Sequence, residues 1–106
     1  MNDVDICYLP AVELADAIRS KTISPVEVTS AVVAHIEALE PKLNAFATFT
    51  PERALDGAKA AEQAVVDGES LGPLHGVPVT LKDLTTTKDV PTQRGSKIFA
   101  DHIPDT

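Results

Sequence analysis

The chain is poor in the residues that build disulfides, metal centres and large aromatic cores. Its 106 residues include one cysteine, no tryptophan and 4% aromatic residues. A single cysteine, Cys7, excludes an internal disulfide and any site built from several thiolates, and we interpret it as a small packed residue. The three histidines, His35, His75 and His102, are not spaced like metal ligands, so we expect no metal and no other cofactor.

Positive charge is also scarce. Nine lysines and arginines face 16 acidic residues, which gives a net charge of −7. Nucleic acids and anionic membrane surfaces favour positively charged proteins, so we expect neither as a direct partner. No run of about eighteen apolar residues could span a membrane, and residues 1–10 lack the basic and apolar regions of a signal peptide. These absences predict a cytoplasmic protein.

Bulky side chains for a core are few. The hydrophobic fraction is 43%, but much of it is alanine, with three phenylalanines and one tyrosine. Alanine favours helices and buries little area. The length suits one domain, and the composition predicts a helical flank that packs against a partner sheet.

Hydrophobic periodicity predicts three helices, at about residues 11–21, 25–40 and 51–66. The second begins with Ser24-Pro25-Val26-Glu27, a capping box with proline at the first helical position, and Pro41 is expected to end it. Asp67-Gly68 is expected to end the third in a left-handed conformation.

An alternating stretch, Val77-Pro78-Val79-Thr80-Leu81-Lys82, predicts a short strand at about 77–82. A lysine that ends a strand beside packed apolar surface loses solvation, and its neutral amine can then act as a base. From the pattern alone, such a lysine is more often a solvated residue that protects a sheet edge. Asp83 would point away from Lys82 in a regular strand, so the two are not expected to pair.

Two residues before the strand are expected to shape its approach. We expect His75 to form a hydrogen bond within its own turn and so aim the strand. Gly76 is expected to serve a close backbone approach or a special dihedral angle.

The stretch Gly72-Pro73-Leu74-His75-Gly76-Val77-Pro78-Val79-Thr80-Leu81-Lys82-Asp83 resembles the lysine segment of the amidase signature family. That segment reads G-P-L-H-G-[IV]-P, then two or three apolar residues, then K-D. Downstream, Val90 to Ser96 resembles the family's T-x-x-G-S stretch, with Gln93 where a second threonine is common. Upstream, the likeness includes Leu43-Asn44-Ala45-Phe46 and Arg53-Ala54-Leu55, so it covers nearly the whole chain.

The resemblance implies hydrolysis of amide bonds by two serines and a lysine, one serine lying on a cis peptide bond. It identifies Lys82 as the catalytic lysine, which would accept a proton relayed from the nucleophile and return it to the departing amine. It also implies an α/β fold, in which residues 1–106 are the N-terminal part of a single domain: helices plus the first strands of a mixed sheet. The partners would be a small-molecule amide and the remainder of the fold.

The most severe departure from the family pattern concerns the serines. The family's serines lie in a segment of the form G-G-S-S-G-G, and this sequence contains no such segment. Gly95-Ser96 is the single Gly-Ser pair, and Ser96 is more typical of a cap for a short helix that begins at Lys97. We therefore expect the isolated chain to supply Lys82 and to be inactive.

Two other functions stay open at this point. The glutaminase subunit of a tRNA-dependent amidotransferase shares the signature, and a truncated remnant of an amidase could serve as an interaction module without enzymatic activity. The sequence does not reveal which amide is cleaved, and it leaves a homodimer open.

Overall fold

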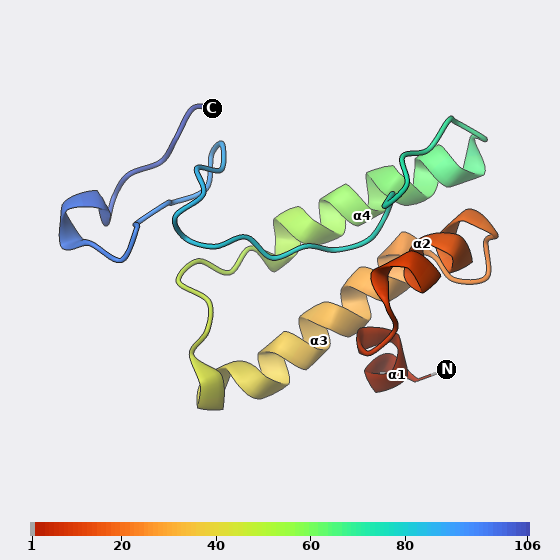
Figure 1. The fold of residues 1–106 in the computed structure, drawn as a ribbon, viewed down its shortest axis with the longest axis horizontal. Coiled ribbons are helices and arrows are strands. Elements are labelled where there is room, and N and C mark those ends of the chain that lie inside the picture. Colours follow the sequence, from red (N-terminus) through yellow and green to blue (C-terminus); the bar gives the residue numbers. More distant parts are fainter. Residues whose placement is uncertain (1) are drawn as a thin grey trace.

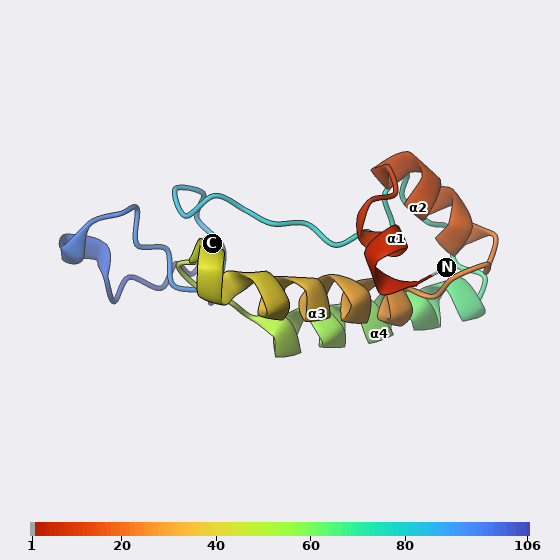
Figure 2. The same cartoon turned by 90° about the horizontal axis from the view of Figure 1, so that it is seen from below.

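The computed structural model describes residues 2–106, which form four α-helices and one 3₁₀ turn. The elements are α1 (Asp3–Cys7), α2 (Ala11–Arg19), α3 (Pro25–Leu43), α4 (Pro51–Val66) and the 3₁₀ turn Lys97–Phe99. Helices α3 and α4 lie side by side, and α1 packs against α3 (Figures 1 and 2). After α4 the chain runs back along the helices and then extends beyond them (Figure 1).

The expected α/β class is wrong for this chain. Residues 2–106 contain no strand, so neither the mixed sheet nor the strand at 77–82 is present. The stretch 77–82 runs as an extended coil (Figure 2). A strand requires a ladder of hydrogen bonds to a second strand, and within the described residues no second strand pairs with this one. The alternating pattern at 77–82 therefore does not lead to a strand in the described residues, and Val79 and Leu81 are exposed together with Thr80 and Lys82.

The three expected helices are present as α2, α3 and α4, with differences at their ends. Helix α3 begins with the expected capping box: Ser24 Oγ accepts from the Glu27 amide at 3.0 Å, and Glu27 Oε2 accepts from the Ser24 amide at 3.1 Å. Helix α2 ends at Arg19 instead of near residue 21, because Lys21 adopts a left-handed conformation with φ of 63°. That conformation cannot continue a right-handed helix.

The expected end of α3 at Pro41 is also wrong, because the helix continues to Leu43. A proline removes one backbone donor and strains one turn, and here the helix ends two residues later. Asn44, with φ of 46°, terminates it in the left-handed conformation. The Glu40 carboxylate then accepts hydrogen bonds from the next two backbone amides.

The end of α4 agrees with expectation, and α1 was not foreseen. Gly68 has φ of 70°, and the Glu69 amide donates to the Ala64 carbonyl at 3.1 Å, which completes a left-handed stop. Helix α1 is one short turn with its own capping box between Asn2 and Asp5. That pair was a readable signal for a helix start.

The hydrophobic core is small and lies where α1 and α2 meet the first half of α3 and the last turns of α4. Its fully buried centre is formed by Ile18 and Val28, which are 1% and 0% exposed. Its other buried members are Ile6, Leu14, Ile23, Ala31 and Val65. Within residues 2–106, no helix combines the length and apolarity needed to cross a membrane.

Replacing Val28 by Ala should lower the free energy of unfolding by about 2 kcal/mol, because it leaves a cavity in a packed core. Val66→Ala is the matched control: this valine also lies in a helix but is 64% exposed, so the change should stay within about 0.5 kcal/mol. Urea denaturation followed by circular dichroism measures both. Equal effects of the two substitutions would contradict the position of the core.

Candidate functional site around Lys82

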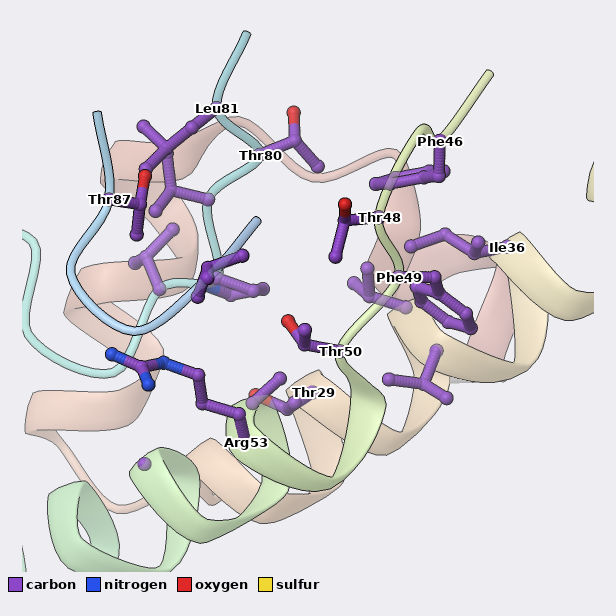
Figure 3. A pocket seen from close by; sticks show the side chains of 18 of the residues that line it. Thr29, Ile36, Phe46, Thr48, Phe49, Thr50, Arg53, Thr80, Leu81 and Thr87 are labelled. Carbon is purple, nitrogen blue, oxygen red and sulfur yellow. The ribbon is translucent and has the colours of Figure 1, made fainter. Parts of the chain in front are cut away.

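A wide cavity of about 1130 Å³ lies between the helices and the segment that follows Gly76. Thr48, Thr50 and Arg53 line one wall, before and at the start of α4, and Arg53 extends its guanidinium into the cavity (Figure 3). Thr80 and Leu81 line the facing wall. The cavity therefore brings together polar hydroxyl groups and apolar surface from segments about thirty residues apart.

Lys82 belongs to the lining of this cavity and is exposed to water. Leu81, beside it, is 57% exposed, and Val79 is 78% exposed. Residues 2–106 thus do not supply the apolar shelter expected around the amine. That shelter stays a prediction for a longer polypeptide.

The approach to the lysine segment is attached to two helices. His75 Nε2 lies 2.8 Å from the Ala61 carbonyl oxygen of α4, so it donates a hydrogen bond there. Arg19, at the end of α2, donates to the Gly72 carbonyl at 3.2 Å. The side chain of His75 therefore attaches the turn to α4, and the expected bond within the turn is made by the backbone, where the His75 amide donates to the Gly72 carbonyl at 3.3 Å.

Gly76 meets both conditions that were expected of it. Its φ of +81° is one that side chains rarely tolerate, and its backbone lies directly on the core. A Cβ atom at this position would lie 3.0 Å from Pro25 Cγ and 3.2 Å from Ile18 Cδ1. The path of the chain toward Lys82 thus depends on a residue without a side chain.

Asp83 accepts two hydrogen bonds from one turn. Its Oδ1 accepts from the Gln93 amide at 2.9 Å, and its main-chain oxygen accepts from the Arg94 amide at 3.0 Å. This agrees with the expectation that Asp83 does not pair with Lys82. The role of Asp83 could not be recognised from the pattern of the strand, because its partners Gln93 and Arg94 lie ten and eleven residues further along the chain.

Ser96 acts as a cap, as the sequence predicted. Its Oγ accepts from the Ile98 amide at 3.2 Å and begins the 3₁₀ turn. Nearby, Thr92 is 2% exposed, and its hydroxyl donates to the Val90 carbonyl at 3.2 Å. The hydroxyl groups of this region therefore hold the backbone.

Cys7 lies apart from this chemistry. Burial, and then the charge of Asp3, raises the pKa of its thiol, and Sγ donates weakly to the Ala31 carbonyl at 3.6 Å. The thiol therefore stays protonated at neutral pH, which fits a packed residue. Among residues 2–106, no three acidic, histidine or cysteine side chains converge in a way that could hold a metal ion.

Replacing Gly76 by Ala should destabilise the chain by about 2 to 4 kcal/mol, because strain at positive φ adds to overlap with the core. Gly68→Ala is the matched control: its φ is +70°, and no atom lies within 4 Å of the added Cβ. The Gly68→Ala variant should lose about 1 kcal/mol of its free energy of unfolding. Thermal denaturation of both variants isolates the packing contribution, and equal losses would contradict the close approach.

Comparison with known proteins matches the chain to one family. The Amidase family model matches residues 27–106, which include the whole lysine segment. A glutamyl-tRNA(Gln) amidotransferase subunit of Geobacter metallireducens is 46% identical over 92 residues, or 87% of this chain and 19% of that protein. The putative amidase AmiD of Mycobacterium tuberculosis is 42% identical over 99 residues, or 93% of this chain and 21% of that protein.

An acylamidase of Rhodococcus erythropolis is 38% identical over 103 residues, or 97% of this chain and 22% of that protein. The chain thus spans about a fifth of the length of these curated relatives, and the matches correspond to an N-terminal portion. With the family match covering most of its residues, the chain belongs to the amidase signature family.

Proposed function

We propose that this chain is the N-terminal portion of an amide-bond hydrolase and that Lys82 is its catalytic lysine. The observation that carries the proposal is the placement of Lys82. It ends the family's lysine segment, lines the cavity and follows a stretch attached to the helices at His75 and Gly76. An amine held in this way can be aimed at a reacting group.

The mechanism requires Lys82 without its charge. An ammonium group has donors only, so the neutral amine must take the proton that leaves the nucleophilic serine through a bridging serine. The serine oxygen then attacks the amide carbonyl, and the same proton passes back to the departing nitrogen as the carbon–nitrogen bond breaks. Both serines would come from a later segment of a longer polypeptide. That segment would also cover the amine, and without it the 106 residues should show no turnover.

Two substrate classes have support among the relatives. One relative is named as part of an amidotransferase and another as an amidase, at 46% and 42% identity, so identity favours neither. We propose that the substrate is a small-molecule amide. In the alternative, the longer polypeptide is the glutaminase subunit of a tRNA-dependent amidotransferase, and its substrate is glutamine. Ammonia released from glutamine by the longer polypeptide, with no hydrolysis of simple aryl amides, would select the alternative.

The proposal extends to the rest of the molecule. Residues 1–106 would form one domain with the remainder of the amidase fold. We also propose a cytoplasmic location and no direct contact with nucleic acid, and the net charge of −7 supports the second of these.

In the longer polypeptide, Lys82→Ala should lower kcat for a carboxamide by at least about a thousandfold, because proton transfer by a positioned base is lost. Lys82→Arg should be equally impaired, since a guanidinium keeps the charge but cannot accept a proton. Lys88→Ala changes an exposed lysine six residues along the chain and should leave kcat within about twofold. Steady-state ammonia release measures all three, and turnover retained by Lys82→Ala would refute the role.

A further inference from the structure

We propose that Asp83 is a positioning residue: it ties the end of the lysine segment to the turn Gln93–Ser96 and thereby fixes where Lys82 meets the cavity. This inference rests on the proposed function of Lys82. It concerns a residue that acts through its neighbour, because Asp83 itself bonds to backbone and not to a reacting group.

The attachment has two points. The Asp83 carboxylate and the Asp83 main-chain oxygen accept from consecutive amides, Gln93 at 2.9 Å and Arg94 at 3.0 Å. Two hydrogen bonds to the same residue restrain the orientation of Asp83 relative to the turn as well as its distance from the turn. A charged acceptor also makes the side-chain bond stronger than one between neutral groups, and Asp83 is partly buried, which limits competition from water.

The turn on the other side of this attachment is itself held in place. Arg94 and Gly95 both adopt left-handed conformations, with φ of 56° and 68°, and the Arg94 guanidinium lies 5.2 Å from the centre of the Phe99 ring. The amides of Thr92 and Asp89 donate, each at 2.9 Å, to carbonyls of residues 102 and 104. Asp83 therefore joins the lysine segment to a folded loop.

The other end of the lysine segment is attached to the helices at His75 and Gly76. Between Gly76 and Asp83 the segment has no sheet ladder in the described chain and crosses beside the helices (Figure 2). Asp83 is thus the attachment that follows Lys82, as Gly76 is the one that precedes it. Losing Asp83 would leave the amine restrained from one side.

The direction of the Asp83 carboxylate also matters for Lys82. A carboxylate that paired with the neighbouring amine would favour its protonated form and oppose its use as a base. Here Oδ1 is engaged by the Gln93 amide. Asparagine at this position keeps an acceptor oxygen and removes the charge, so it separates the contribution of position from that of charge.

The first test needs no catalytic activity. Hydrogen exchange of the Gln93 amide, measured by NMR on the 106-residue chain, should become at least about fivefold faster in Asp83→Ala, because the amide loses its acceptor. It should stay within about twofold in Asp83→Asn and in Asp101→Ala, which changes an exposed acidic residue of the same loop. Unchanged exchange in Asp83→Ala would overturn the attachment.

The second test uses the longer polypeptide. Asp83→Ala should lower kcat by about tenfold to a hundredfold with KM within about twofold, because a small misplacement of a catalytic group slows the chemical step. Asp83→Asn should restore kcat to within about threefold of the parent. Equal impairment of the Ala and Asn variants would assign the effect to charge and overturn the positioning role, as would normal kcat in Asp83→Ala.

The two proposals fail separately. If Lys82→Ala retains turnover, the proposed function is wrong, and faster exchange at Gln93 in Asp83→Ala would still establish the attachment. If Lys82→Ala is inactive while Asp83→Ala has normal exchange and normal kcat, the inference about Asp83 is wrong and the proposed function stands.

Discussion

The contact of the Gly76 backbone with Ile18 and Pro25 is the constraint on which the site depends. Here the backbone of Gly76 packs against two fully buried side chains of the core end of the molecule, and the contact leaves no room for a Cβ atom. His75 adds a hydrogen bond to α4 from the adjacent position. Because the approach to Lys82 is attached to the packed end of the molecule, movement of the helices there would move the lysine segment as well.

The molecule is divided between a packed end and an unpacked one. Buried residues from α1, α2, α3 and α4 gather at the first, whereas the cavity lies between the middle of α3, the first three turns of α4 and residues 76–92, and it reaches the core at Ile6 and Leu14. The alanine-rich composition explains this division, since small side chains can form helices without filling the space between them. The exposed apolar residues of the lysine segment face this space from its edge, which fits a chain that spans about a fifth of its relatives.

Charge and hydrogen bonding act together at the lysine. The neighbouring carboxylate, Asp83, accepts a hydrogen bond from the Gln93 amide, so its oxygen holds the backbone. The same residue that could have stabilised the ammonium form of Lys82 instead restrains its position. In the proposed enzyme, the remaining requirement is shelter from water, which residues 2–106 do not provide for this exposed side chain.

The sequence by itself determined the features that depend on neighbours within five residues, together with the family. The Ser24 capping box, the left-handed stop at Gly68 and the Ser96 cap were all predictable, because each bond joins residues close in the chain. Only the tertiary structure decided the absence of a strand at 77–82, the bond from His75 to α4 and the attachment of Asp83 to Gln93. Each of these features depends on a partner residue ten or more positions away in the sequence. The periodicity of a short stretch does not specify which distant residue will lie beside it in the fold.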